Sequence, residues 1–402
     1  MFYFICKVQM RNSKDLFFKL GELGNNSIEM MRKNSFSDKQ SKELRTWNLS
    51  ETATLVKRTS QCIRDHEKQE NGLPKAKTNP KSNKRFYTLS DINFMREYFQ
   101  TCPVYNPYNT PPAVIAFTNF KGGVAKTTTA VHASQYFAKL GYKVLIVDID
   151  SQASTTSAFG YIPDEEIDTN KTLLPFLLGD IKNIEDVISD TYWPNLNIIP
   201  ANLALYGAEL KLPVLKENAI ARGEKLSIID LLHKGLTQVY DKYNIIIIDC
   251  PPAMSILNTN ALYAANSLVI PCPAAIPDIA SMFQFFNMVG DALEKMPEKE
   301  YSFIRVLITK NDGSKSSFEL ATILRKLFGQ IIMRSEMFNS QAIAQCRAEL
   351  NSIYEVSQYK GSKQTITRAT QIMDSIYNEL EEYIREAWET SFNNNAVKTN
   401  EI

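Results

Sequence analysis

Residues 119–129 read NFKGGVAKTTT and stand between the apolar run Val114–Phe117 and a helical pattern. The pair Gly122–Gly123 lets the backbone bend, so that its N–H groups and the positive end of the following helix can hold phosphate oxygens. Lys126 can reach the β- and γ-phosphates of a nucleotide, and the Thr127 hydroxyl can bind Mg²⁺. A plain glycine turn is the alternative. The succession of strand, glycine-rich loop and helix predicts a phosphate-binding loop.

The sequence around this loop, from residue 113 to about 370, alternates apolar runs with amphipathic helical stretches. Continuous apolar runs are what a parallel sheet covered on both faces requires, and the helices between them supply the crossovers. We therefore expect an α/β domain with a doubly wound, mostly parallel sheet of the P-loop NTPase class. The expected strands are Val114–Phe117, Val144–Val147, Leu196–Ile199, Ile245–Ile248, Leu268–Ile270 and Val306–Ile308.

Two acidic motifs follow strands of this sheet. Asp148 and Asp150 come at the end of one apolar run, and Asp249 follows four consecutive isoleucines. Carboxylates at the carboxyl edge of a parallel sheet face the bound ligand. In isolation such residues would read as polar strand ends. After a phosphate loop they predict a metal and nucleotide site.

These motifs together resemble the ParA/MinD family of ATPases. The loop departs from the standard Walker A pattern, because Phe120 and Ala125 occupy its glycine positions. It is similar instead to the family's deviant motif K-G-G-x-x-K-[TS], in which Lys121 is the signature lysine. The segment after Asp249, which reads Cys-Pro-Pro, also resembles ParA-like proteins, whereas Ser151 stands where the family usually has proline.

The resemblance implies Mg²⁺-dependent hydrolysis of ATP to ADP by a homodimer, in which Lys121 crosses to the partner's nucleotide. It places Asp148 in the metal shell through water and assigns Asp150 to the attacking water. The catalytic candidates are Lys121, Lys126 and Asp150, and the metal candidates are Thr127, Asp148 and Asp249. The expected nucleotide contacts are Lys121, Gly122, Gly123, Val124, Ala125, Lys126, Thr127 and Thr128, with Asn311 as a candidate for the adenine base.

Residues 46 to about 96 carry a second pattern. A short helix over residues 50–56 is followed by a turn and by a second helix over residues 61–69. Five basic residues and no acid then lie between Gly72 and Phe86. This order resembles a winged helix-turn-helix of the MerR type, and longer ParA proteins carry such an operator-binding unit. A surface helical pair with a lysine-rich loop is the alternative. The DNA-contacting candidates are Thr59, Gln61, Arg64, His66, Lys75, Lys77, Lys81, Lys84 and Arg85.

Four segments are expected along the chain. Residues 1–45 hold a helix with an apolar stripe as a candidate dimer contact, and residues 46–110 hold the DNA-binding unit with a proline-containing linker. The ATPase domain follows over residues 111–390, with a last amphipathic helix near Asp374–Trp388, and residues 391–402 are expected to form a disordered tail.

The composition excludes several classes of protein. With 44% hydrophobic residues in 402, the chain has ample material for a core and is not mainly disordered. A formal charge of +1 means that nucleic-acid contacts must come from local patches. Six scattered cysteines suit a reducing cytosol and lack the spacing of a disulfide framework. No apolar stretch is long enough for a transmembrane helix.

The resemblance as a whole implies a DNA-partitioning ATPase of the cytoplasm and nucleoid. Its ATP-bound dimer would bind DNA without sequence preference, a ParB-type centromere-binding partner would stimulate hydrolysis, and the N-terminal unit would repress its own operator. The basic residues Arg347, Lys360 and Lys363 are assigned to solvated surface.

Alternative functions remain at this point. A nucleotide-gated transcriptional regulator without a transport role would use the same two units. A MinD-like membrane-cycling ATPase is disfavoured, because the acidic segment 374–389 would be repelled by anionic lipid. An iron–sulfur reductase would need clustered cysteines, and a glutamine-dependent synthetase would need an additional amidotransferase domain.

Overall fold

The computed structural model describes residues 14, 19, 21, 23, 24, 42–69, 72–78, 84–103, 110–296, 299–356 and 359–400. The chain divides into one unit before Leu44 and a second unit from Leu44 to Ile402. Seven residues of the first unit are described: Lys14, Lys19, Gly21, Leu23 and Gly24 are helical, whereas Lys42 and Glu43 are not. Most of its expected apolar stripe, and Lys81 of the expected basic wing, lie outside the described residues.

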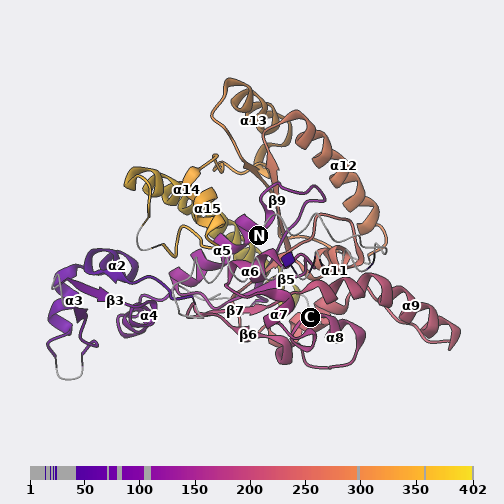
Figure 1. Ribbon diagram of the computed structural model, residues 1–402, viewed down its shortest axis with the longest axis horizontal. Helices are drawn as coiled ribbons and strands as arrows, with labels where there is room; N and C mark the ends of the chain where they lie inside the picture. Colours follow the sequence, from indigo (N-terminus) through magenta and orange to yellow (C-terminus); the bar gives the residue numbers. More distant parts are fainter. Residues whose placement is uncertain are drawn as a thin grey trace. The chain divides into compact units, whose positions relative to one another are not determined.

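A seven-stranded sheet forms the centre of the second unit, in the order β10-β9-β4-β8-β5-β7-β6 (Figure 1). All neighbouring pairs are parallel except β6 with β7. The expected doubly wound sheet is confirmed, and each of the six expected strands is present. The strands are β4 (Ala113–Phe117), β5 (Val144–Asp148), β6 (Ser189–Asp190), β7 (Leu196–Ile199), β8 (Ile245–Asp249), β9 (Ser267–Pro273) and β10 (Phe303–Thr309).

Helices cover both faces of this sheet. On β4, Ile115 and Phe117 belong to one hydrophobic cluster with residues of α5 and α15, whereas Val114 and Ala116 belong to a second cluster with residues of α11 and α12. Because side chains alternate along a strand, two covered faces require the continuous apolar runs seen in the sequence. The helices are α5 (Lys126–Leu140), α6 (Ser154–Ala158), α7 (Pro163–Glu166), α8 (Leu174–Leu178), α9 (Gly207–Ala221), α10 (Leu231–Leu236), α11 (Ile256–Ala264), α12 (Ile276–Leu293), α13 (Lys315–Phe328), α14 (Gln341–Ala348) and α15 (Lys363–Asn400).

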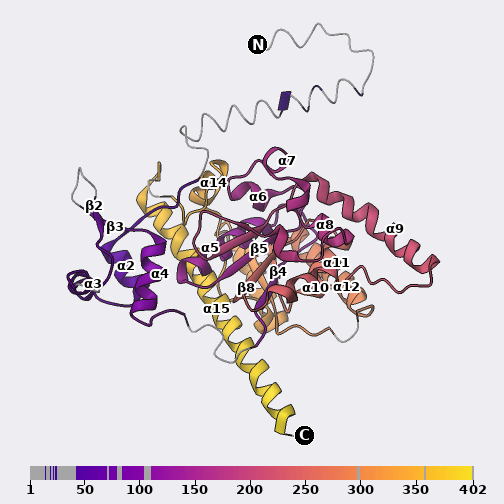
Figure 2. The ribbon, with the colours of Figure 1, turned by 90° about the horizontal axis from the view of Figure 1, so that it is seen from below.

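The last helix corrects the expected disordered tail for residues 391–400, whereas residues 401 and 402 lie outside the described part of the chain. Figure 2 shows α15 as one continuous helix, and it continues to Asn400. Buried residues recur every three or four positions along it, including Met373, Ile376 and Leu380. No glycine or proline interrupts the sequence from Lys363 to Asn400, so nothing local ends the helix at residue 391.

A small three-stranded antiparallel sheet, in the order β1-β3-β2, precedes the large one. The side chain of Asn48 caps α2, and the side chain of Thr88 caps α4. The second helix of the unit, α3, ends at His66 and is shorter than expected. The elements are β1 (Trp47–Asn48), α2 (Leu49–Val56), α3 (Ser60–His66), β2 (Lys77–Thr78), β3 (Arg85–Tyr87) and α4 (Leu89–Tyr98).

The buried guanidinium of Arg96 joins this N-terminal part to the large sheet's helices. It donates from α4 to the carbonyl of Lys139, in the last turn of α5, at 2.6 Å, and to Asn93 Oδ1 at 2.6 Å. A cation at the carbonyl end of a helix is favourable for both hydrogen bonding and the helix dipole. Arg96 thus fastens α4 to the end of α5 that lies away from the glycine loop.

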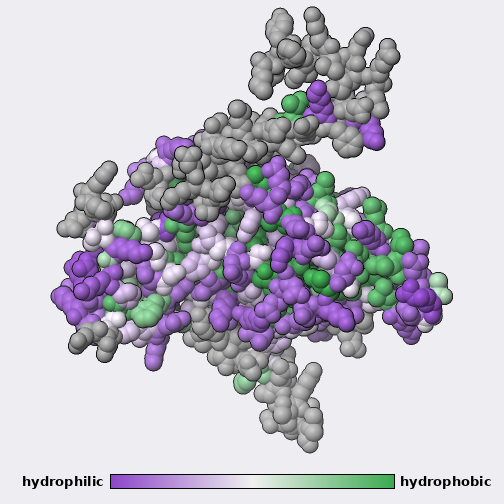
Figure 3. Space-filling view, turned by 60° about the horizontal axis from the view of Figure 1, so that its bottom comes forward, coloured by the Kyte–Doolittle hydropathy of each residue, from purple (hydrophilic) through white to green (hydrophobic). Residues whose placement is uncertain are grey.

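Helix α9 presents an apolar face to solvent. Two further exposed apolar residues lie in the turn just before α9, after the chain leaves the carboxyl end of β7. Figure 3 shows hydrophobic side chains gathered at the right of a mostly hydrophilic face. None of the described helices is long and apolar enough to cross a membrane. The exposed apolar side chains are Leu203, Tyr206, Leu210, Val214 and Ile220.

Candidate nucleotide-binding site

The glycine loop connects the buried end of β4 to the first residue of α5. Gly123 has a φ of 74° and Ala125 a φ of 78°, which turns the backbone sharply before the helix begins. Asn119 holds the start of the loop, because its Oδ1 accepts from Lys121 N at 3.1 Å and its Nδ2 donates to Pro271 O at 2.9 Å. The N-terminus of α5 has no side-chain cap, so its N–H groups remain available for an anion.

Lys126 lies across this loop with its side chain largely buried. Its Nζ donates to the backbone carbonyl of Lys121 at 2.9 Å. Burial lowers the pKa of Lys126, and the carboxylates of Asp249 and Asp150 oppose that shift. The ammonium is thus held at the mouth of the loop, where phosphate oxygens would be stronger partners than a carbonyl.

Asp249 lies at the end of β8, beneath the loop, and is fully buried. Its Oδ2 accepts from Thr155 Oγ1 at 2.7 Å, whereas its Oδ1 has no hydrogen-bond partner among the residues that the structure describes. Burial raises the pKa of Asp249, and the hydroxyls of Thr155 and Thr127 lower it. A buried carboxylate oxygen without a partner is costly.

These groups fit a magnesium ion. The orphaned Asp249 oxygen and the Thr127 hydroxyl are hard oxygen ligands of the kind that Mg²⁺ prefers. No cluster of three or more His, Cys, Asp or Glu side chains that could hold a metal occurs in the described part of the chain. A metal here would therefore take its remaining ligands from phosphate and water.

Asp148 shapes the loop that follows β5. Its Oδ2 accepts from the backbone and hydroxyl of Thr156, at 2.9 and 2.7 Å, and its Oδ1 accepts from Asp150 N at 3.2 Å. Burial and the neighbouring Asp249 raise the pKa of Asp148. Both Asp148 oxygens therefore face protein donors, and they position Asp150 at the wall of the cavity.

Lys121 points away from its own loop. Its Nζ lies 2.8 Å from Oδ1 of Asp278, in the first turn of α12. Its side chain is about one-third exposed, at 35%, and is absent from the residues that line the cavity beside the loop. The signature lysine is thus held within its own chain by an ion pair.

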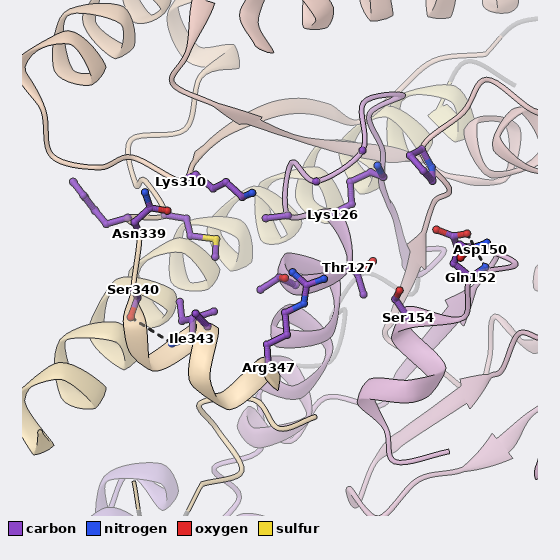
Figure 4. A pocket seen from close by; sticks show the side chains of 18 residues that line it. Lys126, Thr127, Asp150, Gln152, Ser154, Lys310, Asn339, Ser340, Ile343 and Arg347 are labelled. Carbon is purple, nitrogen blue, oxygen red and sulfur yellow. Dashed lines mark hydrogen bonds between the residues drawn. The ribbon is translucent and has the colours of Figure 1, made fainter. Parts of the chain in front are cut away.

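A cavity of about 480 Å³ opens above the loop (Figure 4). The structure brings seven sequence-predicted residues to its wall, which are Gly122, Gly123, Ala125, Lys126, Thr127, Thr128 and Asp150. Val124 is buried instead, and its carbonyl accepts from Thr309 Oγ1 at 3.0 Å.

Asn311 does not reach this cavity. Its Nδ2 donates to Glu336, and its Oδ1 accepts from Gly313 N at 2.8 Å, so the side chain braces the loop after β10. The neighbouring Lys310 lines the cavity. The residues that close the cavity opposite the loop are not predicted by any motif in the sequence; they are Met337, Phe338, Asn339, Ser340, Ile343, Ala344 and Arg347.

Some of the predicted DNA-contacting residues are held by contacts within the chain, and others are exposed. The hydroxyl of Thr59 caps α3, and Gln61 Nε2 donates to Asp65 Oδ1 at 2.9 Å. Arg85 forms an ion pair with the buried carboxylate of Glu67. Lys75 and Lys77 are exposed. Arg64, Lys84 and Arg85 line one open hollow of about 520 Å³ together with Asn48, Leu49, Ser50 and Ser60.

Comparison with known proteins identifies relatives over most of the chain. A family model described as an AAA domain matches residues 112–299. The protein SopA of Escherichia coli K12 is 31% identical over 373 residues, which cover 90% of this chain and 95% of SopA. The sporulation initiation inhibitor protein Soj of Bacillus subtilis is 38% identical over 200 residues, covering 50% of this chain and 73% of Soj.

A solved structure described as a partition protein has the same fold. It superposes with a TM-score of 0.64 at 19% identity, and it covers 92% of this chain and 99% of that one. This similarity supports the mostly parallel sheet and its helical layers, including the part of the chain before residue 112.

Proposed function

Because the chain belongs to the ParA family of partition ATPases, we propose that it hydrolyses ATP to ADP and phosphate with Mg²⁺ in order to partition DNA. The ATP-bound form is a homodimer that binds DNA without sequence preference in the cytoplasm, on the nucleoid. A ParB-type centromere-binding protein stimulates hydrolysis and ends that binding. The N-terminal unit binds its operator and represses transcription.

One observation carries the enzymatic part of this proposal. A loop with free helix N–H groups, a buried lysine and an orphaned carboxylate oxygen converge on one cavity. Magnesium bound there with ATP supplies charge neutralisation on the phosphates. Lys126 binds the β- and γ-phosphates, and the Thr127 hydroxyl and Asp249 Oδ1 hold the metal. The Asp150 carboxylate at the cavity wall orients the water that attacks.

Lys121 supplies the link between nucleotide and dimer. Since it points away from its own cavity, its ammonium is available to the phosphates of a second chain once it leaves Asp278. Two nucleotides bring several negative charges to one interface, and each chain adds a cation there. The exposed apolar face of α9 fits a surface that another protein covers.

The experiment that tests this function measures mass in solution, by light scattering after gel filtration, with Mg²⁺ and either ADP or ATP. The wild type is expected to be dimeric only with ATP. Lys126→Ala should lose nucleotide binding, whereas Lys121→Ala should bind ATP but neither dimerise nor turn it over normally. A wild type that stays monomeric and shows no nucleotide-dependent change would exclude the proposal.

A second function, nucleotide-gated transcriptional regulation without DNA transport, is favoured by the hollow around Arg64. Gel shifts with operator DNA and random DNA, each with ADP and ATP, separate the two. Binding to the operator alone supports the regulator, whereas ATP-dependent binding to any DNA supports partition. In either case Arg64→Ala should weaken operator binding by about 1–3 kcal/mol and leave binding to random DNA nearly unchanged.

A further inference from the structure

Helix α14 presents one continuous face to the nucleotide cavity. Ser340, Ile343, Ala344 and Arg347 all line the cavity, and their spacing of three and four residues puts them on the same side of a helix (Figure 4). Ser340 also caps α14, since its side chain accepts from the backbone N–H of Ile343. The helix is therefore a built wall of the cavity, and it comes more than 200 residues after the glycine loop.

Arg347 stands where two cavities meet. It lines the nucleotide cavity and also a second, smaller cavity of about 190 Å³, and the two share Thr127, Thr128 and Ser154. Figure 4 shows the Arg347 side chain reaching from α14 toward Thr127, in the first turn of α5. Its guanidinium is thus beside the end of α5 that binds anions.

The Arg347 guanidinium has no hydrogen bond or ion pair with any residue in the described part of the chain. Two other basic residues of the C-terminal part form ion pairs with carboxylates. Lys360 pairs with Glu349, and Arg325 pairs with Glu336. An arginine without a carboxylate partner beside an anion-binding helix end adds positive charge to the cavity.

We propose that Arg347 binds the phosphate chain of the nucleotide at oxygens that ATP and ADP share. This rests on the proposed function, in which the cavity takes ATP. Lys126 reaches the β- and γ-phosphates, whereas the backbone at the start of the helix cradles the α- and β-phosphates. Arg347 faces that helix start, and its planar fork suits two phosphate oxygens at once. The C-terminal part of the chain thereby contributes a residue to the nucleotide-binding site.

The test compares Arg347→Gln and Arg347→Lys with the wild type in equilibrium titrations with ATP, ADP and adenosine. Arg347→Gln should weaken the binding of ATP and the binding of ADP by the same factor, roughly tenfold, because hydrogen bonds to charged groups contribute on that scale. Arg347→Lys should keep part of the affinity, since it keeps the charge and loses the fork. Binding of adenosine, which has no phosphate, should be unchanged.

A matched control is Arg222→Gln, which removes an exposed arginine that pairs with Glu224 and does not line the cavity. It should bind both nucleotides like the wild type. Because Arg347 is exposed, its variants should keep the melting temperature of the wild type.

Several outcomes would overturn the proposal. Unchanged ATP and ADP affinities in Arg347→Gln would do so, and so would a loss confined to ATP or a matching loss for adenosine. Normal nucleotide affinity with lost retention on random DNA would instead make Arg347 a DNA contact. A wild type that binds no nucleotide would refute the proposed function itself, which is a different result.

Discussion

Lys121 and Asp278 form an ion pair across 2.8 Å, between the glycine loop and the first turn of α12. The pair holds the signature lysine within its own chain. A lysine that must reach a second chain has to leave this partner first. In the mechanism proposed above, the pair therefore competes with dimerisation.

Replacing Asp278 by asparagine should favour the ATP-bound dimer. Each pair is partly exposed and worth about 0.5–1 kcal/mol, and two pairs are lost for every dimer, so the dimer dissociation constant should fall roughly five- to thirtyfold. Sedimentation with ATP at a series of protein concentrations measures this constant. Asp291→Asn removes an exposed carboxylate from the same helix and serves as the control. A weaker dimer in Asp278→Asn would show that Asp278 supports the interface.

Replacing Asp249 by asparagine should stabilise the nucleotide-free protein and abolish Mg²⁺-dependent turnover. The native carboxylate is buried beside Asp148 and Asp150, and one of its oxygens lacks a partner among the described residues. Asparagine keeps an oxygen for Thr155 and removes the charge, a change worth about 1–3 kcal/mol. Thermal melting and phosphate release measure the two effects. Lower stability together with intact turnover would contradict the assignment of Asp249 to the metal.

His132 should make the free energy of unfolding depend on pH. Burial lowers the pKa of His132 below the ordinary value for histidine of about 6.5, while its contact with Thr128 O and the charge of Glu355 oppose the shift. Below about pH 6.5 the imidazole of His132 is protonated in the unfolded chain but stays neutral in the native protein. The free energy of unfolding therefore falls as pH falls, by up to about 1.4 kcal/mol per pH unit. Urea titrations at about pH 7 and about pH 5.5 measure this fall. It should be smaller in His132→Gln, and an equal fall in both proteins would exclude His132 as its source.

Arg96→Met should destabilise the chain by about 2–3 kcal/mol, because the carbonyl of Lys139 and the Asn93 side chain lose a charged donor in a buried place. The midpoint of urea unfolding measures the loss. Arg368→Met, at an exposed position of α15, should change the midpoint little. If both variants unfold at the wild-type midpoint, the Arg96 contact contributes nothing to stability.

The central sheet could be predicted because each strand carries its own signal. Ile245–Ile248 is apolar at every position, which only a strand covered on both faces tolerates. The glycine loop could be predicted as well, because its strand, turn and helix are contiguous in the chain. The end of the last helix is harder to predict, because Asn393–Asn395 are poor helix formers, yet no glycine or proline interrupts the helix there.

The far wall of the cavity could not be predicted, because it depends on contacts between distant segments. No pattern in residues 337–347 indicates that this segment lies near a loop some 200 residues earlier in the chain. Asn311 is expected at the adenine base, but Lys310 lines the cavity instead, and its φ of 51° lies in the left-handed region. This turn breaks the alternation of side chains that a continuing strand would show. Lys310 therefore faces the cavity, and Asn311 braces the loop.

The contact between Arg96 and Lys139 constrains how such proteins can be recombined. A helix of 15 residues, like α5, is a stiff rod about 22 Å long. One end of α5 begins at the glycine loop, and the carbonyl of Lys139 at the other end accepts a hydrogen bond from Arg96. A chimaera that exchanges the module before residue 110 must therefore supply an arginine at the position of Arg96, or the carbonyl of Lys139 loses its charged donor.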